Sequence, residues 1–164
     1  MLVALVQSGQ ILADTIEGRV IKVADGDTIT VLDQFKTQHK IRIGGIDAPE
    51  KKQAYGNVAK QKMSDLVFGK NVKIDTHKKD RYKRNIGRVW VAAPECRGTC
   101  PKTLDAGMTL LTVGLAWHYK KYEREQPPQE REQYSYTEIE ARAKRLGLWR
   151  DPNPVPPWEW RHRK

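Results

Sequence analysis

Cysteines are scarce in this sequence, and long apolar runs are missing. The 164 residues include only two cysteines, Cys96 and Cys100, so cysteines alone cannot complete a four-ligand structural zinc site. No apolar run approaches the roughly 20 residues that a membrane-spanning helix needs. The C-x3-C spacing leaves two alternatives open, a short-loop disulfide or two free thiols in a surface loop.

Negative charge is also in short supply. Lysine and arginine number 30 against 20 aspartates and glutamates, which gives a formal net charge of +10. So large a charge on a small chain favours a polyanionic partner such as nucleic acid. The alternative is that the charge serves solubility or nonspecific adhesion. A group of acids within this basic chain favours a phosphodiesterase, because a metal ion can bridge carboxylates and phosphate.

The chain divides into three parts by composition. Residues 1–16 form an N-terminal arm or leader remnant, since they are mostly apolar and end in Leu12-Ala13-Asp14. Residues 17–150 form one globular domain. Residues 151–164 are a basic tail rich in proline and tryptophan, for which we expect an extended path over the surface and no regular structure.

Alternating and helical hydrophobic patterns outline a mainly β domain with helices, of the α+β class. Five short strands with a helix after the third predict a small closed barrel. The expected strands are residues 17–24, 27–33, 39–46, 71–77 and 86–93, and the expected helices are 55–68, 102–113 and 134–146. Residues 94–101 are expected to be an irregular insertion, and residues 123–133 a charged linker.

Carboxylates cluster where two predicted strands end. Asp25 and Asp27 follow the first strand, and Asp47 and Glu50 follow the third. If these strands are neighbours, the acids lie close together, which is unfavourable unless a cation is bound. Asp27 and Asp47 are therefore candidate ligands of a hard divalent cation. The alternative is that Asp25-Gly26-Asp27 is only a hairpin turn and that Asp47 is only a turn or cap.

Glu50 lies three residues beyond Asp47, close enough to reach a metal-bound water molecule. A general base of this kind contributes about 10²–10⁴ to a rate. The alternative is an exposed loop glutamate paired with a nearby lysine.

Two arginines are candidates for binding a phosphate. Arg42 stands between Ile41 and Ile43, so in a strand its side chain points away from the core and toward the acids. Arg84 ends a basic loop, residues 78–85. Two guanidiniums can clamp a phosphate and stabilise its transition state. The alternatives are a strand ion pair from Arg42 to Asp27 or Glu50, and for Arg84 one of several solvated cations.

Five motifs occur in one order along the chain: V-A-D-G-D-T, I-R-I-G-G-I-D-A-P-E, D-R-Y-K-R, G-L-A-W, and Y-S-Y-T-E-I-E-A-R followed by G-L-W. In this order, over residues 17–149, the chain resembles the staphylococcal-nuclease-like thermonucleases. The resemblance implies an OB-fold five-stranded barrel with three helices. It also implies calcium-dependent hydrolysis of DNA and RNA, with little sequence preference, that leaves 3′-phosphate ends.

The same resemblance implies a role for each matching residue. Asp27, Asp47 and the backbone carbonyl of Ala48 correspond to calcium ligands, and Asp25 acts on the ion through water. The implied catalytic residues are Arg42, Glu50 and Arg84; the implied substrate-binding residues are Arg81, Tyr82 and Tyr119; and Glu138 holds the segment around Tyr119 in place.

Two positions depart from the best-known member of the family: Ala48 replaces a threonine, and Lys83 replaces a glycine, which affects the placement of Arg84. The rival function is a nucleic-acid-binding module of the same fold that lacks catalysis. We further expect a monomer located in the periplasm or secreted, with the cytoplasm as the alternative.

Overall fold

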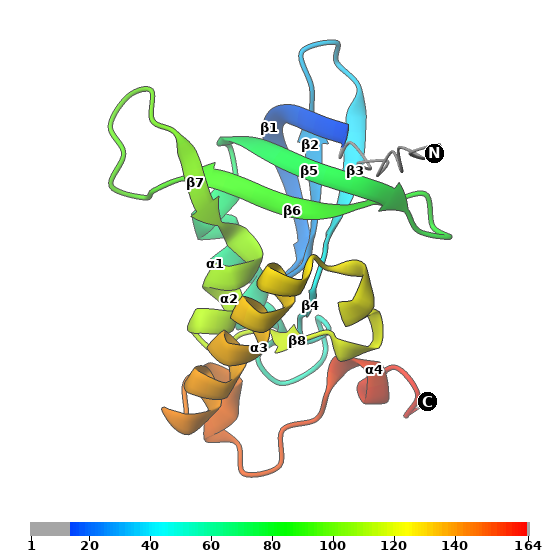
Figure 1. Cartoon of the computed structure of the whole chain (residues 1–164), viewed down its shortest axis with the longest axis vertical. Coiled ribbons are helices and arrows are strands. Elements are labelled where there is room, and N and C mark those ends of the chain that lie inside the picture. The colour runs from blue at the N-terminus through cyan, green and yellow to red at the C-terminus, as the bar shows by residue number, and fades with distance from the viewer. Residues whose placement is uncertain (1–13, 164) are drawn as a thin grey trace, which may run out of the picture.

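A computed structural model of the protein describes residues 14–163, which form a β-barrel with helices gathered at one end (Figure 1). The strands are β1 (Asp14–Asp25), β2 (Thr28–Leu32), β3 (Gln38–Ile43), β4 (Ile46–Asp47), β5 (Asn71–Lys79), β6 (Asn85–Ala92), β7 (Lys102–Asp105) and β8 (Trp117–His118). The helices are α1 (Gly56–Val67), α2 (Ala106–Thr112), α3 (Pro128–Ala143) and α4 (Pro157–Trp160), with 3₁₀ turns η1 (Lys120–Glu125) and η2 (Gly147–Arg150).

Five strands close the barrel in the order β3-β2-β1-β5-β6, and a parallel pairing of β3 with β6 completes the circuit. The long β1 makes closure possible, because it pairs with β5 from Asp14 to Arg19 and with β2 from Arg19 to Asp25. Register shifts after Val20 and Val23 bend β1 between these partners. The predicted closed five-stranded barrel with helices is therefore confirmed.

The barrel interior is filled by β-branched side chains at every second strand position. Alternation along a strand sends successive side chains to opposite faces, so one face of each strand is apolar. Fully buried examples are Ile29, Val31, Ile41, Ile43, Ile74, Val89 and Val91. Helix α1 covers one end of this core through Ala59, Met63, Leu66 and Val67.

The second predicted helix begins later than the sequence suggested. Residues 102–105 form strand β7, which extends the sheet beside β6, and α2 starts only at Ala106. Asp105 causes the break, because its backbone is extended and its side chain accepts a hydrogen bond from the Met108 amide as an N-cap. The hydrophobic spacing that predicted one helix over 102–113 spans a strand and a helix.

The third predicted helix begins earlier than expected. We predicted a linker over 123–133, but η1 covers Lys120–Glu125 and α3 starts at Pro128. Proline is favourable at the first helical position, where its missing N–H has no partner to lose. The Pro127-Pro128 pair therefore marks the start of a helix.

Both ends of the predicted domain also differ from expectation. Residues 14–16, assigned to the N-terminal arm, pair with Ile74, Asp75 and Thr76 of β5 as part of β1. The rest of that arm, residues 1–13, lies outside the described residues. The tail was expected to lack regular structure, but it contains α4, whose first turn begins at Pro157, again a proline at a favourable position.

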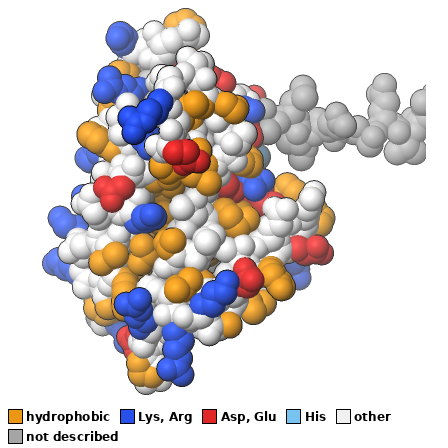
Figure 2. All heavy atoms as spheres, turned by 90° about the vertical axis from the view of Figure 1, so that its left-hand side faces the viewer, with side chains coloured by type: hydrophobic (Ala, Val, Ile, Leu, Met, Phe, Trp, Pro, Cys, Tyr) orange, Lys and Arg blue, Asp and Glu red, His pale blue; other side chains and the backbone are white. Residues whose placement is uncertain are grey.

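Cys96 and Cys100 form a disulfide in the loop between β6 and β7. On the face shown in Figure 2, lysine and arginine side chains are scattered among polar and apolar groups and form no continuous patch. None of the helices in the described part of the chain is long and apolar enough to cross a membrane.

A buried polar contact joins α3 to α2 and the barrel. The Tyr134 hydroxyl donates to Asp105 Oδ2 at 2.8 Å, and Arg88 Nε donates to the same oxygen at 2.5 Å. Burial, then the charge of Asp105, raises the pKa of Tyr134 well above its ordinary value, so the phenol remains a donor.

We predict that Tyr134→Phe lowers the free energy of unfolding by about 1–2 kcal/mol, because it removes a buried, charge-assisted hydrogen bond. Tyr136→Phe on the exposed side of α3 is the matched control and should leave stability unchanged. Urea unfolding followed by circular dichroism measures both. Equal midpoints for the two variants would contradict the assigned contact.

Candidate active site

The turn between β1 and β2 brings the first two acids into the site. The Asp27 amide donates to Asp25 Oδ1 at 3.1 Å, which fixes the turn. Gly26 sits at its tip, where a Cβ atom would lie 2.7 Å from the Ala48 Cβ and 2.9 Å from the Ala59 Cβ. Only glycine allows the turn to approach the segment after β4 so closely.

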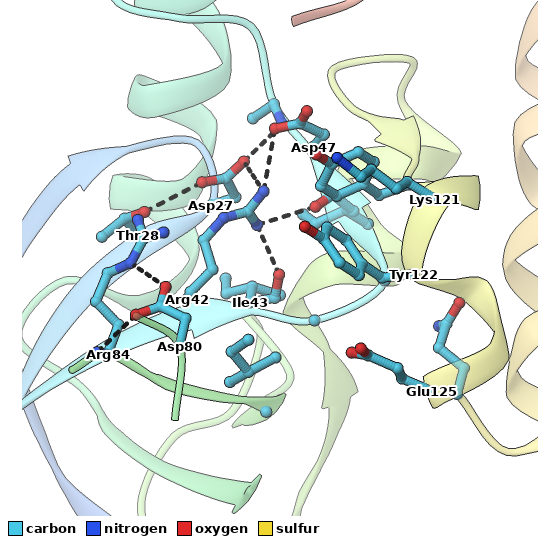
Figure 3. A pocket seen from close by; sticks show the side chains of 18 of the residues that line it. Asp27, Thr28, Arg42, Ile43, Asp47, Asp80, Arg84, Lys121, Tyr122 and Glu125 are labelled. Carbon is cyan, nitrogen blue, oxygen red and sulfur yellow. Dashed lines mark hydrogen bonds and ion pairs between the residues drawn. The ribbon is translucent and has the colours of Figure 1, made fainter. Parts of the chain in front are cut away.

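This approach places Asp27 beside Asp47. The two acids meet although the strands before them are not neighbours as we had supposed, because β2 lies between β1 and β3. The Ala48 amide donates to Asp27 Oδ2 at 2.6 Å, which ties the segment after β4 directly to the turn. Both carboxylates are buried, at 6% exposure for Asp27 and 1% for Asp47. Figure 3 shows Arg42 lying between them.

Arg42 holds the two acids together. Its Nη2 lies 3.0 Å from Asp47 Oδ1 and 3.2 Å from Asp27 Oδ2. Its Nη1 donates to two carbonyls, those of Ile43 at 2.8 Å and Ile46 at 2.9 Å. Ile41 and Ile43 are buried in the core, so the predicted orientation of Arg42 toward the acids is confirmed.

Burial disfavours the ionised forms of Asp25 and Asp47. Burial, followed by the neighbouring charge of Asp27, raises the pKa of Asp25 to about 7. Burial also raises the pKa of Asp47, although hydrogen bonds from arginine oppose the shift. Carboxylates with raised pKa values are poised to bind a cation, because its charge would restore their ionised forms.

The oxygen atoms here fit a hard divalent cation. Within residues 14–163 no three or more His, Cys, Asp or Glu side chains are arranged as a closed metal site. A cation at Asp27 and Asp47 would therefore use two carboxylates, the Ala48 carbonyl and non-protein ligands. Calcium and magnesium accept such oxygen-rich, partly hydrated sites.

Glu50 lies beside Asp47 but is more accessible. Its side chain is 37% exposed, compared with 1% for Asp47. Its Oε1 accepts a hydrogen bond from Arg161 Nη1 at 2.8 Å. The predicted proximity of Glu50 to the metal-ligand candidates is present, and its partner is an arginine of the tail.

Arg84 lines the same groove, and within residues 14–163 its side chain has its ion pair with Asp80 and none with Asp27, Asp47 or Glu50. Its Nε donates to Asp80 Oδ2 at 2.7 Å (Figure 3). Burial opposes ionisation of Asp80, but the hydrogen bonds from Arg84 outweigh it and lower the Asp80 pKa. The guanidinium also lies 5.4 Å from the ring centroid of Tyr82.

The loop around Arg84 has an internal counterpart. Asp80 Oδ1 accepts from the amides of Tyr82 and Arg84, as Asp33 Oδ1 accepts from the amides two and four residues ahead of it. Lys83 has φ 61° and Lys36 has φ 65° at the matching positions. Lys83 therefore adopts the left-handed conformation that glycine would favour, and the loop forms despite that substitution.

Tyr119 forms the aromatic wall of the groove. Its amide donates to the Gly45 carbonyl at 2.8 Å. The adjacent His118 amide donates to buried Glu138 of α3, so Glu138 holds this segment as the resemblance implied. Tyr122 packs edge-on against the Tyr119 ring, with centroids 5.0 Å apart.

Sequence reasoning missed three residues of the groove. Asp80 fixes the Arg84 loop, and Arg161 and Trp158 reach the site from the tail. The Asp80–Arg84 spacing of four residues was a usable signal. Nothing in the tail sequence shows where the tail lies.

Comparison with known proteins decides the family. The sequence model of the family "Staphylococcal nuclease homologue" matches residues 40–151. The chain belongs to the staphylococcal nuclease family. It is 39% identical, over 99% of its length and 96% of the relative's, to a protein of Escherichia coli O157:H7 named "Uncharacterized endonuclease".

Two further relatives with nuclease names are similar to the chain. A Shigella flexneri protein named "Micrococcal nuclease" is 40% identical over 88% of this chain and 79% of its own. The Arabidopsis thaliana "Staphylococcal-like nuclease CAN1" is 38% identical over 76% of this chain but only 34% of its own. The predicted family is confirmed, and with it the class of nuclease hydrolase.

We predict that Lys83→Gly changes stability by less than about 1 kcal/mol, whereas Lys83→Val destabilises the protein by about 1–3 kcal/mol. Glycine adopts a positive φ freely, while a β-branched residue there is strained. Urea unfolding of the two variants provides the comparison. A valine variant as stable as the glycine variant would show that the loop does not need the left-handed conformation.

Proposed function

We propose that the protein is a calcium-dependent nuclease that hydrolyses DNA and RNA with little sequence preference and leaves 3′-phosphate ends. The observation that carries this proposal is the convergence of Asp27, Asp47, Arg42 and Glu50 at the wall of one groove. The groove is also lined by cationic side chains suited to a phosphate backbone, namely Lys40, Lys78, Lys79, Arg81, Arg84, Lys120 and Lys121.

Asp27, Asp47 and the Ala48 carbonyl would hold the calcium ion, and Asp25 would act on it through water. When bound, the ion supplies positive charge that offsets the phosphate charge and makes phosphorus more electrophilic. Asp25 also holds the Asp27 amide, so it positions the first of these ligands.

Glu50 is the proposed proton acceptor. A water molecule attacks phosphorus, its proton passes to the Glu50 carboxylate, and the bond from phosphorus to the 5′ oxygen breaks. The 5′ oxygen takes a proton from solvent water and leaves as a hydroxyl, so the phosphate stays on the 3′ end. Glu50 suits this role because its carboxylate is accessible, whereas the Asp47 carboxylate is buried.

Arg42 and Arg84 are the proposed donors to the phosphate oxygens. Two carbonyls and two carboxylates take the N–H groups of both terminal nitrogens of Arg42, which fixes the guanidinium and leaves its Nε–H to donate to a phosphate oxygen. Arg84 is held through Nε, which leaves its terminal nitrogens available to turn toward a phosphate. The two arginines approach from different parts of the barrel, Arg42 from β3 and Arg84 from the loop before β6.

Aromatic side chains support weak sequence preference. Tyr82 is 65% exposed, and Tyr119 lines the groove, so both can stack on nucleobases, with Arg81 contacting a phosphate. Every base presents a π-face, and stacking contributes about 1–3 kcal/mol per base without reading its edges.

The alternative function is nucleic-acid binding without hydrolysis. The acids and arginines that hydrolysis needs stand together in this structure, which favours catalysis. Tight binding without cleavage in the presence of calcium would favour the alternative.

Export to the periplasm or medium is part of the proposal. The Cys96–Cys100 disulfide supports it, because disulfides persist mainly in oxidising compartments. We also propose that the protein acts as a monomer.

We predict that Glu50→Gln reduces cleavage by about 10²–10⁴-fold, because the amide cannot accept the proton. Glu140→Gln, on the exposed surface of α3, is the matched control and should cleave normally. Plasmid degradation in calcium measures the rate, and fluorescence anisotropy of a labelled oligonucleotide measures binding. Full activity of the Glu50 variant would remove Glu50 from the mechanism.

We predict that a chelator abolishes cleavage and that added calcium restores it, because the buried acids need the ion's charge. The products should be extended by a DNA polymerase only after phosphatase treatment, which would identify 3′-phosphate ends. Unchanged cleavage in chelator would rule out the metal, and direct extension would rule out the proposed product.

A further inference from the structure

An arginine of the tail contacts both carboxylate oxygens of buried Asp47 and one of Glu50. Arg161 Nη2 donates to Asp47 Oδ2 at 2.8 Å, and Arg161 Nη1 donates to Glu50 Oε1 at 2.8 Å and Asp47 Oδ1 at 3.2 Å. Residues 151–163, which carry this arginine, are here called the strap. The strap thus engages one proposed calcium ligand and the proposed general base at once.

The strap also covers the aromatic wall of the groove. The Trp158 ring lies parallel to the Tyr119 ring, with an interplanar angle of 10° and centroids 5.6 Å apart. Trp158 also packs edge-on against Trp117, with ring centroids 5.5 Å apart. Gln53 Nε2 donates to the Val155 carbonyl at 2.5 Å, which fixes the strap before α4.

We propose that the strap is an autoinhibitory segment in which Arg161 competes with the divalent cation for Asp47. The proposal rests on the proposed function, since it takes Asp47 to be a calcium ligand. In the closed state Arg161 occupies Asp47 and Glu50, and Trp158 occupies the face of Tyr119 on which a nucleobase would stack. Calcium and substrate therefore both favour the open state.

Charge decides the competition. Three acidic side chains, Asp27, Asp47 and Glu50, face only two guanidiniums, those of Arg42 and Arg161, among the ion pairs of residues 14–163. A divalent cation at Asp47 would meet the Arg161 guanidinium at the same oxygens, and two positive groups at one site repel each other. Arg42 cannot leave, because two backbone carbonyls hold it, so Arg161 is the group that is displaced.

The contacts of the strap suit reversible opening. The Arg161 side chain is 39% exposed, and partly exposed ion pairs add little stability and weaken with salt. The barrel core contains no residue of the strap, so opening leaves it intact. A ligand that binds only the open state then shifts the population by its differential affinity.

The test is calcium binding to the full chain, measured by isothermal titration calorimetry and by tryptophan fluorescence. Arg161→Gln should bind calcium roughly tenfold more tightly, because the partly exposed Arg161 guanidinium no longer competes for Asp47. Arg161→Lys, which keeps the charge but loses the two-pronged contact, should fall between wild type and Arg161→Gln.

Arg163→Gln is the matched control. It removes the same charge two residues away, and Arg163 is exposed and makes no side-chain hydrogen bond or ion pair within residues 14–163. Its calcium affinity should stay within about twofold of wild type, the change expected from long-range charge alone. Calcium should also alter wild-type tryptophan fluorescence as Trp158 leaves Tyr119, and Trp158→Phe should reduce that change.

Three results would overturn the proposal that the strap is autoinhibitory. Equal calcium affinity in wild type and Arg161→Gln would show that Arg161 does not compete, and the proposed nuclease function would still stand. Weaker binding in Arg161→Gln would show that Arg161 supports the cation site. Absence of calcium binding in every variant would remove the calcium site itself, and the strap with it.

Discussion

The buried ion cluster around Arg42 is the constraint on which the rest of the structure depends. Asp27 comes from the β1–β2 turn, Asp47 from β4 and Arg42 from β3, so one guanidinium links three parts of the chain. Two carboxylates could not lie this close in the interior without it, and two backbone carbonyls leave it no freedom to move. The barrel supplies the scaffold, since Ile41 and Ile43 on either side of Arg42 fill its core. Three consecutive residues of β3 therefore contribute both to the barrel core, through Ile41 and Ile43, and to the acid cluster, through Arg42.

Features set by local pattern were accessible from the sequence. Alternation in β3 predicted where Arg42 points. The places of Asp27 and Asp47 at strand ends predicted that they meet, although β2 separates the two strands that we assumed to be neighbours. Boundaries failed where one residue overrode a pattern, as Asp105 did by capping α2 and Pro128 did by starting α3. The position of the tail was out of reach for a different reason. The contact between Arg161 and Asp47 joins residues 114 apart in sequence, and no periodicity or spacing encodes such a pairing.

The strap changes how the acid cluster is understood. A site that attracts a divalent cation also attracts a cationic side chain of the same chain. Arg161 reaches Asp47 from the strap, whose Trp158 stacks on Tyr119. Burial keeps Asp47 in need of a partner, while exposure keeps Glu50 reachable by water and by the strap alike. The two acids thus share one competitor although they have different proposed tasks. Regulation through this contact needs no second site.

The paired aspartate turns carry a consequence for engineering. Residues 33–37 and 80–84 have the same hydrogen bonds and the same left-handed lysine, yet only the second lies in the groove. The same backbone turn therefore forms with different side chains at its third and fifth positions, Phe35 and Thr37 in one copy and Tyr82 and Arg84 in the other. Grafting residues 80–84 onto the β2–β3 hairpin would carry Tyr82 and Arg84 to a new edge of the barrel without redesigning the barrel. The protein thus contains this turn twice, once in the groove and once in the β2–β3 hairpin.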